Sequence, residues 1–576
     1  MVILQNILLP SKNFSQLSDE FYLKTVGNKE KYNTYFNLLN IETLKERCSL
    51  DNLQLKVSGR GHFNVSLIAS NDLIGEEVVA NFTFGAEVSK EQAFEVSSWK
   101  SFKYKFLFVE VEKIVPSEIV SISFASSSPV VTPVKLGVVI VHYNRKDWVL
   151  PALKRLKLEL LNDEEYKSKI ALVVVDNSQN ITDEESCGVN IIKNKNLGGS
   201  GGFTRGMLHF KDLNYTHCLF MDDDASCEIE SIKRTWALLS YAIVPRFSIA
   251  GSLLTEESPT LIYEKGATFK YVNKAQFSGY DMSVAEDLAA VEKCISEDQY
   301  GGWWFFAFKI SDAVFFPFPF FVRGDDIMFS LLNRLNVYTT NGIGCWGDDF
   351  ALKATPLSCY LDVRSLILNN LCSSRQGIIG CLIFLSKHFF LHLLSLNYAS
   401  VRAIRDSLYD TSLGPTFWKE NMDTEYIRGK IASYSQKEKM LPLNLKDFNY
   451  DICPVPSHRY LKGVKPPIDF SVYIRALLFN GAFLPDFLMK KNYLLIPKGK
   501  YGGLKYAFRY NKIIYFDEKT ATGYVAKLNR KLLLRESMTY FGLCLKILLN
   551  RKKYRADLEK AVEMYTKESF WRSVYS

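Results

Sequence analysis

Three apolar runs, each ending in polar residues, constrain the fold of this chain most strongly. The runs are KLGVVIVHYN, KIALVVVDNSQ and THCLFMDDDA, and segments of helical periodicity separate them. Continuous apolar runs of this length are typical of strands in a parallel sheet that is buried on both faces. Ligands of open α/β sheets lie at the carboxyl ends of the strands, so the polar residues that follow the runs should converge on one crevice.

The residues expected at that crevice are His142 to Arg145, Asp176 to Ser178 and Asp222 to Asp224. After the first run, Asp147 is a suitable N-cap for a helix. That helix would place one apolar stripe against the sheet, formed by Val149, Leu150, Leu153, Leu156 and Leu160.

The acid triplet after the third run needs a neutralising cation, because adjacent carboxylates repel one another. At a turn, Asp222 and Asp224 can both reach one divalent ion. Oxygen ligands favour Mg²⁺ or Mn²⁺, which would bridge to the phosphates of a nucleotide diphosphate. A helix N-cap with solvated acids is the alternative.

A glycine run precedes the triplet, in the stretch NKNLGGSGGFTRGM. Its glycines would let the backbone approach a ligand closely, and Arg205 would enter the next helix within reach of an anion. The spacing fits neither a dinucleotide-binding turn nor a P-loop. Phosphate binding by this expected loop is therefore compatible with the sequence but not indicated by it.

Two motifs follow further along the chain, YGGWW and RGDD. The indole rings of Trp303 and Trp304 can stack on a sugar, although adjacent tryptophans are more often core residues. In the second motif, Asp325 and Asp326 can cap a helix, or one of them can take a proton from an attacking hydroxyl as a general base.

The patterning divides the chain into three parts. Short alternating runs between residues 53 and 124 predict an N-terminal β-sandwich over residues 1–130, which ends in the linker ASSSPVVTP. Residues 131–370 form the predicted α/β domain with a Rossmann-like sheet. Residues 371–576 are predicted to be mostly helical and basic.

Composition narrows the class of protein. The formal charge of +9 favours anionic partners such as a nucleotide sugar or a membrane surface, but falls short of a nucleic-acid-binding composition. The 11 cysteines show neither C-x-x-C pairs nor zinc spacings, which argues against disulfides and a structural metal and for a reducing compartment.

Membrane signals are weak. The N-terminus has no basic segment or cleavage site typical of a signal peptide. The apolar stretch GIIGCLIFLSKHFFLHLLSL carries charged and histidine side chains near its middle, so it predicts a buried or interfacial helix. We expect a cytoplasmic protein without a transmembrane segment. The basic cluster Arg551, Lys552, Lys553 and Arg555 is either a peripheral membrane contact on the inner face of the plasma membrane or a solvated charge run.

The motifs together resemble a family. VVIVHYNR, VVVDNS, NLGGSGGFTRG, FMDDDA, YGGWW and GDD, in this order, are similar to the bacterial galactofuranosyltransferases, which include the galactan-polymerising enzyme of mycobacteria. The resemblance implies a GT-A fold, inverting chemistry, and transfer of galactofuranose from UDP-galactofuranose to a lipid-linked glycan.

The resemblance also implies roles for individual residues. Asp326 matches the general base, and Asp325 lies beside it on the acceptor side. Trp303 would wall the donor sugar site and Trp304 the acceptor site. Asp222 and Asp224 would bind Mn²⁺ or Mg²⁺. The remaining donor-side residues are Arg145, Asp176, Asn196, Arg205 and Asp223.

One departure from the family concerns the third metal ligand. The family usually has a histidine where this chain has Gly347, in the stretch CWGDD. Asp348 or Asp349 could supply an oxygen instead, fewer protein ligands could hold the metal, or the domain could bind its donor weakly. Tyr360 and Arg364 keep the family's spacing downstream.

The sequence thus predicts a metal-dependent inverting glycosyltransferase that extends a bacterial surface polysaccharide. Two alternatives are a GT-A transferase that uses another nucleotide sugar, and a glycan-binding protein with weak or lost turnover. Nucleic acid is not an expected partner, and homo-oligomer formation is left open.

Overall fold

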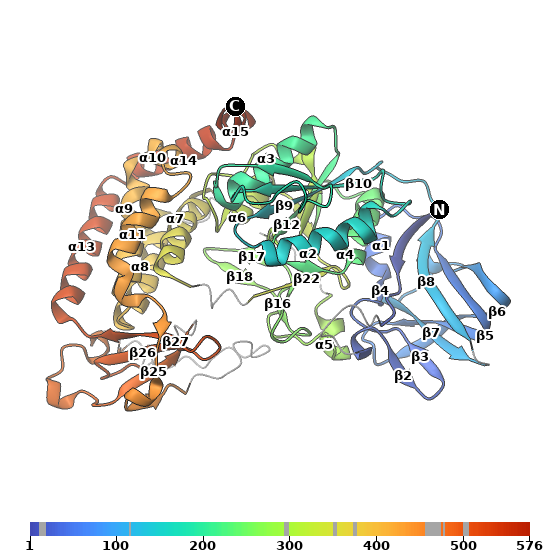
Figure 1. Ribbon diagram of the computed structural model, residues 1–576, viewed down its shortest axis with the longest axis horizontal. Coiled ribbons are helices and arrows are strands. Elements are labelled where there is room, and N and C mark those ends of the chain that lie inside the picture. Colours follow the sequence, from blue (N-terminus) through green and yellow to red (C-terminus); the bar gives the residue numbers. More distant parts are fainter. Residues whose placement is uncertain are drawn as a thin grey trace.

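A computed structural model of the chain describes residues 1–576 apart from 11–18, 115–116, 293–298, 349–353, 373–376, 455–473, 476–477 and 499–505. Asp349, one of the two alternatives for the third metal ligand, lies outside the described residues. Figure 1 shows an N-terminal β region at one end, an α/β unit in the centre and a helical region at the other end.

The central unit contains the predicted sheet. Seven strands follow the order β11-β10-β9-β12-β20-β14-β21, and β20 runs antiparallel to both of its neighbours. Their bounds are β9 Leu136–His142, β10 Ile170–Asp176, β11 Asn190–Lys193, β12 His217–Asp222, β14 Phe247–Ala250, β20 Phe306–Lys309 and β21 Asn336–Tyr338. The three strands expected from the apolar runs are β9, β10 and β12, which are adjacent and parallel.

The register brings the polar strand ends together, as expected. Asp176 at the end of β10 pairs with His142 at the end of β9, and Asp222 at the end of β12 pairs with Val141. Alternate residues of β9 point to opposite faces, so Val138 lies in one apolar cluster and Val139 in the other. Burial on both faces explains why these strands are continuously apolar.

Helices cover both faces of the sheet. The helices α2 (Lys146–Leu156) and α4 (Ile229–Tyr241) contribute to one apolar cluster, and α3 (Gly198–Asp212) contributes to the other. The expected cap of α2 is wrong: Arg145 occupies the N-cap position, and Asp147 lies within the first turn. Val149, Leu153, Leu156 and Leu160 of the predicted stripe are buried.

The glycine run is helical, which corrects its interpretation as a loop. It forms the start of α3, and its lack of side chains lets the helix lie directly on β9. A Cβ atom on Gly202 would come 2.4 Å from Val141 Cγ1, and one on Gly206 would come 2.2 Å from Val139 Cγ1. Gly198 adopts φ +67 beside the Phe321 carbonyl. Gly202 and Gly206 therefore serve close packing of α3 on the sheet, whereas Gly198 and Gly201 make room for Phe321 and Leu197.

Two small sheets and two short helices complete the unit around the strand ends. The four-stranded sheet has the order β13-β22-β15-β16, and the three-stranded sheet has the order β18-β17-β19. Their bounds are β13 Ser226–Cys227, β15 Ser252–Thr255, β16 Ile262–Glu264, β17 Ala267–Phe269, β18 Asn273–Ala275, β19 Gln299–Tyr300 and β22 Gly344–Gly347. The short helices are α5 (Ala285–Ala290) and α6 (Asp325–Leu332).

The N-terminal region is antiparallel β structure, but its strands form one hydrogen-bonded sheet of eight strands. They are β1 Val2–Asn6, β2 Lys24–Val26, β3 Lys29–Lys31, β4 Leu39–Asn40, β5 Gln54–Ser70, β6 Glu76–Glu95, β7 Phe106–Lys113 and β8 Glu118–Ser126, with helix α1 Ile41–Arg47. The sheet forks at β5, whose first part pairs with β8 and whose second part pairs with β7. The pairing thus describes one forked sheet rather than the two separate sheets of the expected sandwich.

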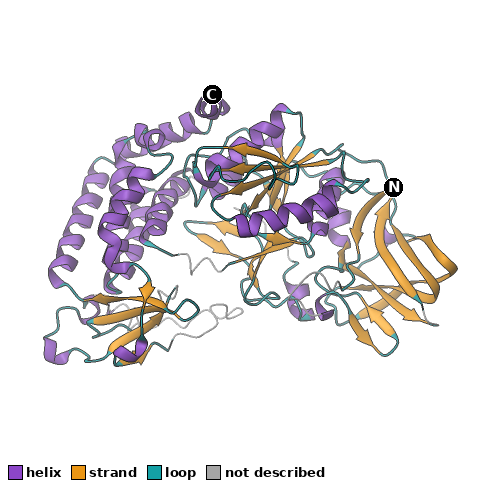
Figure 2. Ribbon diagram, viewed as in Figure 1, coloured by secondary structure: helices purple, strands orange, loops and turns teal. Residues whose placement is uncertain are grey.

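The C-terminal region is helical only in part. Its helices are α7 Pro356–Cys372, α8 Ile378–Leu394, α9 Tyr398–Asp410, α10 Thr416–Glu420, α11 Glu425–Ser435, α13 Arg530–Leu549, α14 Arg551–Tyr565 and α15 Glu568–Tyr575. A five-stranded sheet that the sequence reading missed lies below them in Figure 2, with the order β23-β27-β26-β25-β24. Its strands are β23 Leu441–Pro442, β24 Tyr450–Ile452, β25 Tyr493–Pro497, β26 Lys512–Asp517 and β27 Thr522–Lys527.

The apolar stretch of the C-terminal region forms α8, a helix of the bundle. Leu385, Phe389 and Leu393 of this helix are buried in the largest apolar cluster of the bundle. No helix within the described residues combines the length and apolar character needed to cross a membrane.

Candidate active site

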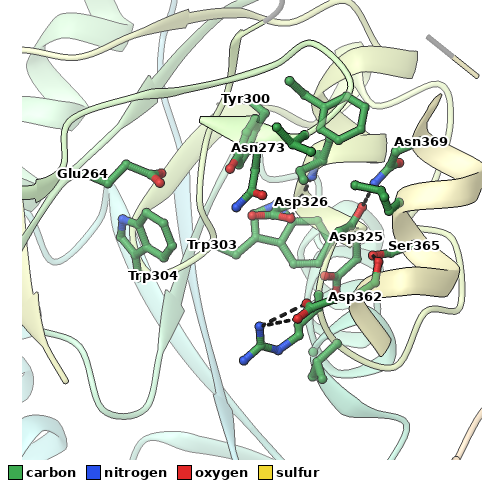
Figure 3. A pocket seen from close by; sticks show the side chains of 18 of the residues that line it. Glu264, Asn273, Tyr300, Trp303, Trp304, Asp325, Asp326, Asp362, Ser365 and Asn369 are labelled. Atoms are coloured by element: carbon green, nitrogen blue, oxygen red, sulfur yellow. Dashed lines mark hydrogen bonds and ion pairs between the residues drawn. The ribbon is translucent and has the colours of Figure 1, made fainter. Parts of the chain in front are cut away.

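A cavity of about 700 Å³ lies at the carboxyl ends of β9 and β12. One wall comes from the acid turn and Arg145, a second from the starts of α3 and α6, and a third from α7 and α8. Figure 3 shows Glu264, Trp304, Asn273 and Tyr300 on one side of it and Asp362, Ser365 and Asn369 on the other. Of the residues expected at the crevice, Arg145, Asp222 and Asp224 line this cavity, together with Trp303, Trp304, Asp325 and Asp326 from the two later motifs.

The acid turn is arranged around Arg145. This guanidinium lies 2.9 Å from Asp223 Oδ1 and 2.7 Å from Asp224 Oδ2. Asp222 and Asp224 line the cavity, as do the guanidinium and its aliphatic stem. The predicted pair of metal-binding carboxylates therefore faces the cavity, beside a cation that offsets their mutual repulsion.

Asp223 shares the Arg145 guanidinium with Asp224, but it is buried and its second carboxylate oxygen contacts the end of β9. Its Oδ2 accepts a hydrogen bond from the Tyr143 backbone N–H and contacts His142 Nδ1 at 3.2 Å. Burial disfavours the charged form of His142, but hydrogen bonds with Asp223 and Asn180 outweigh it and raise the pKa of the imidazole. Asp223 thus ties the ends of β9 and β12 together, a positioning role rather than the expected direct donor contact.

Asp176 is fully buried and its carboxylate is used by its own loop. It accepts hydrogen bonds from backbone N–H groups of residues 178–181 and from the Ser178 hydroxyl. Burial alone would raise the pKa of Asp176, but hydrogen bonds from Ile181 and Ser178 lower it. Asp176, a predicted donor-binding residue, therefore holds the loop after β10 and does not line the cavity.

Two further predicted donor contacts also lie outside the cavity wall. Asn196 Oδ1 accepts a hydrogen bond from the Gly198 backbone N–H at the start of α3. The Arg205 guanidinium lies 4.9 Å from the ring of Tyr575, on the C-terminal helix α15. Arg205 lies on the part of α3 that α15 covers, so the idea that it meets an anion in the crevice is wrong for this structure.

Asp325 and Asp326 form the first turn of α6, after the N-cap Gly324 at φ +82. Ser200 Oγ donates a hydrogen bond of 2.8 Å to Asp325 Oδ2. Burial raises the pKa of both carboxyls, and the charge of Asp325 raises that of Asp326 further. A carboxylate whose pKa lies above its usual range is a better base near neutral pH.

The two tryptophans differ in their surroundings. Trp303 packs edge-on against Phe203, Phe220 and Phe329, and only 5% of it is exposed. Trp304 is half-buried, and its Nε1 donates to the Gly251 carbonyl at 3.2 Å. Both side chains line the cavity. Trp304 offers an accessible ring there, whereas Trp303 belongs to a packed aromatic core.

Glu264 is a cavity residue that the sequence reading missed. It ends β16, is buried, and lines the cavity near Trp304 (Figure 3). Burial raises the pKa of Glu264 to about 8, helped by the charge of Asp326. At neutral pH this carboxyl is mostly protonated and can donate a hydrogen bond. The signal was present in the apolar run LIYEKGATF, where Ile262 and Glu264 share the inward face of a short strand.

The expected third metal ligand is not brought into the cavity wall. Asp348 follows β22 and is exposed. The pKa of Lys519 is raised, first by its hydrogen bond with Glu257 and also by the charge of Asp348. Gly347 lies near Leu253, with 3.4 Å between its ideal Cβ position and Leu253 Cδ1. Asp348 is therefore not among the described residues that line the cavity beside Asp222 and Asp224.

The helical wall carries another charged pair. Arg323 Nη1 lies 3.0 Å from Asp362 Oδ1 and 3.2 Å from Oδ2, at the edge of the cavity (Figure 3). Asn369 Nδ2 donates to the Gly324 carbonyl and so fixes the turn before Asp325. Arg364, the arginine of the Tyr-x-x-x-Arg spacing, is fully buried and donates a hydrogen bond to the Phe320 carbonyl. It therefore has a packing role.

Residues 137–271 match the family model described as glycosyl transferase family 2. The chain is 23% identical over 418 residues to the galactofuranosyltransferase GlfT2 of Mycolicibacterium smegmatis, which covers 66% of this chain and 64% of that protein. It is 25% identical over 300 residues to GlfT2 of Mycobacterium tuberculosis, which covers 48% of this chain and 45% of that protein. The chain thus spans less than two thirds of the length of either relative.

Among solved structures, the chain is similar to GalNAc-T7 in its crystal structure with UDP, GalNAc and Mn²⁺. The TM-score is 0.31 and the identity 10%, over 43% of this chain and 49% of that one. A similarity of this size supports no conclusion about the present site. The match of residues 137–271 to glycosyl transferase family 2 and the similarity to the two relatives thus support a resemblance of the chain to GT-A proteins of the galactofuranosyltransferase type.

Proposed function

We propose that the chain is an inverting glycosyltransferase that transfers galactofuranose from UDP-galactofuranose to a lipid-linked bacterial glycan. The observation that supports this most directly is one cavity that holds the acid turn, the buried Asp325–Asp326 pair and two tryptophans. A nucleotide sugar needs cationic and metal-binding groups for its diphosphate, whereas an acceptor hydroxyl needs a base. Both kinds of group line the same cavity.

The diphosphate side would be formed by Arg145, Asp222 and Asp224. The donor set of two carboxylates facing the cavity fits a hard divalent cation, so Asp222 and Asp224 would hold Mn²⁺ or Mg²⁺. A bound cation of this kind would neutralise charge on the leaving diphosphate. Arg145 lies beside both acids and offers a guanidinium fork for phosphate oxygens.

The acceptor side would be formed around α6. Asp326 would take the proton from the acceptor hydroxyl as that oxygen attacks the anomeric carbon, and the bond to the diphosphate would break. Asp325, held by Ser200, would orient the hydroxyl. Trp304 would stack against a sugar ring, and protonated Glu264 would donate a hydrogen bond to a sugar oxygen. A single displacement of this kind inverts the anomeric centre.

The test is a transfer assay with a panel of UDP-sugars, Mn²⁺ and a synthetic acceptor, read by product mass and by linkage in NMR. We expect turnover with UDP-galactofuranose, and loss of turnover with retained UDP binding in Asp326→Asn. The matched control is Asp51→Asn, the same change at an exposed acid of the N-terminal region. Normal turnover in Asp326→Asn would overturn the assignment of the base.

The same panel separates the two alternatives. Turnover with a different UDP-sugar alone would assign another donor to the same fold. Asp348 does not line the cavity, which leaves Asp222 and Asp224 as the acid-turn carboxylates there, and this favours the third possibility, a glycan-binding protein with weak or lost turnover. Glycan binding without metal-dependent transfer or donor hydrolysis would support that reading.

We also propose that α13 brings the protein to a membrane surface, where a lipid-linked acceptor would lie. Five large apolar side chains form an exposed stripe along this helix, namely Leu534, Met538, Phe541, Leu545 and Leu549. The acidic residue of α13, Glu536, is buried and paired with Arg405 and Arg535. The one acidic side chain of α13 is thus neutralised and buried, so the exposed stripe carries no carboxylate that would repel an anionic bilayer. Figure 1 shows α13 on the outer side of the bundle, followed by α14 with the basic cluster.

A further inference from the structure

Three metal-ligating side chains meet on the helical wall of the cavity, away from the acid turn. They are Cys359 on α7 and His388 and His392 on α8. One ligand atom from each lies within 4.8 Å of the other two. His388 and His392 are four positions apart, so one turn of α8 presents both rings to the same place. Their ring centroids lie 4.8 Å apart.

The distances match a tetrahedral metal site. Cys359 Sγ lies 3.7 Å from His392 Nε2. Zinc binds thiolate sulfur at about 2.3 Å and imidazole nitrogen at about 2.0–2.1 Å, so two such ligands at the tetrahedral angle are separated by about 3.6 Å. The Cys359–His392 pair already has about this separation, and the ligand atom of His388 lies within 4.8 Å of both.

The surroundings also suit a metal. Cys359 and His392 are buried in the apolar bundle, where polar atoms are costly unless they are satisfied.

One side of the cluster is open. His388 lines the cavity, together with Asp362 and Leu385 from the same two helices. A metal held by three protein groups would therefore keep a fourth position on the cavity side, the arrangement of sites that bind an exchangeable ligand. Soft sulfur and imidazole ligands select zinc-type ions over Mg²⁺ or Mn²⁺, which prefer oxygen.

We infer that Cys359, His388 and His392 bind one zinc-type transition metal ion whose open position faces the cavity. Binding replaces the thiol hydrogen by the metal and releases a proton to solvent. This site is separate from the acid turn in both ligand chemistry and position in the fold, and the inference does not depend on the proposed transferase activity.

The test uses the full chain in an Asp222→Asn, Asp224→Asn background, which removes the oxygen site. The protein is stripped with EDTA, dialysed against Zn²⁺ and analysed for bound zinc by mass spectrometry. We expect one equivalent of zinc, and with Co²⁺ a thiolate-to-metal charge-transfer band in the near ultraviolet. Absence of retained zinc, or a cobalt complex without that band, would overturn the inference.

Variants identify the ligands. Cys359→Ser should lose the cobalt band, and its zinc affinity should fall by more than the roughly 10–100-fold that loss of an outer-shell partner costs. The matched control is Cys381→Ser, another buried cysteine of the same bundle, which should retain both. His388→Asn, at the half-buried cavity-facing ligand, provides a second variant if Cys359→Ser does not fold. Unchanged zinc affinity in His388→Asn, or an unchanged band in folded Cys359→Ser, would refute the ligand set.

Discussion

Ser200 Oγ donates a hydrogen bond of 2.8 Å to Asp325 Oδ2, and so joins two residues that are 125 positions apart. Ser200 stands in the glycine-rich first turn of α3, and Asp325 in the first turn of α6. The Ser200 backbone N–H also donates to the Phe321 carbonyl, three residues before Gly324. The glycine run therefore reaches the chemistry of the cavity through its serine, which orients a carboxylate.

Ser200→Ala should shift the pH dependence of transfer. The hydrogen bond from Ser200 favours the ionised form of Asp325, so its loss should raise the pKa of the coupled carboxyl pair. The acid limb of kcat/KM would then move to higher pH by up to about 0.7 unit, since a net hydrogen bond is worth about 1 kcal/mol. A pH profile of the variant measures this shift. Ser226→Ala, at an exposed serine after the acid turn, serves as the control. A limb that stays in place would show that the bond does not stabilise the ionised carboxylate.

Glu264→Gln should change how stability depends on pH. The pKa of Glu264 is about 8 in the folded protein, above its ordinary value of 4.5, so the folded state holds a proton that the unfolded state releases. Stability of the wild-type protein should therefore decrease as pH rises from about 4.5 to about 8. Removing the ionisable group should make the decrease smaller, so the variant gains stability relative to wild type at pH 8 but not at pH 4.5. Urea unfolding at both pH values measures this, and an equal effect at the two values would contradict it.

Gly206→Ala should destabilise the protein by about 1–3 kcal/mol, the usual cost of forcing extra volume into a packed core. Its Cβ would lie 2.2 Å from Val139 Cγ1 on the central strand, so helix and sheet would have to separate. The control is Gly542→Ala within α13, where nothing lies within 4 Å and helix propensity should add up to about 1 kcal/mol. Denaturant midpoints of the two variants should move in opposite directions. A neutral Gly206→Ala would mean that the glycine run does not set the packing distance.

Met538→Glu should weaken binding to vesicles that contain anionic lipids. Met538 is 72% exposed at the middle of the α13 stripe, and a carboxylate there would lose apolar burial and repel the headgroups. Flotation with the wild type, the variant and Leu158→Glu tests this, because Leu158 is a similarly exposed apolar residue on the central unit. We expect loss in Met538→Glu only. Equal binding of all three proteins, or binding that high salt does not reduce, would refute docking through α13.

The elements predicted from the sequence are those that local patterns determine. The strands β9, β10 and β12 are long, continuously apolar runs, and their burial on both faces is the direct cause of that pattern. The acid turn follows from the end of β12. By contrast, the strands between residues 441 and 527 are short and lie within a mainly helical region, so no long-range pattern distinguished them.

Roles that depend on distant partners were not determined in this way. The sequence grouped Arg205 with the anion-binding residues, but α15 folds back over α3 and brings Tyr575 against that guanidinium. Glu264 was overlooked because its raised pKa comes from burial beside Asp326, a residue 62 positions further along the chain. The Cys359–His388–His392 cluster lacks a zinc spacing because its ligands come from two helices.

The sequence by itself determined the central sheet, the order of its strands' polar ends, and the family to which the motifs are related, because periodicity and short motifs are properties of neighbouring residues. Only the tertiary structure decided which carboxyls are buried, that Gly202 and Gly206 pack α3 on β9, and that Asp348 does not line the cavity. Burial, pKa and ligand geometry arise from contacts between segments far apart in the chain, and those contacts exist only once the chain is folded.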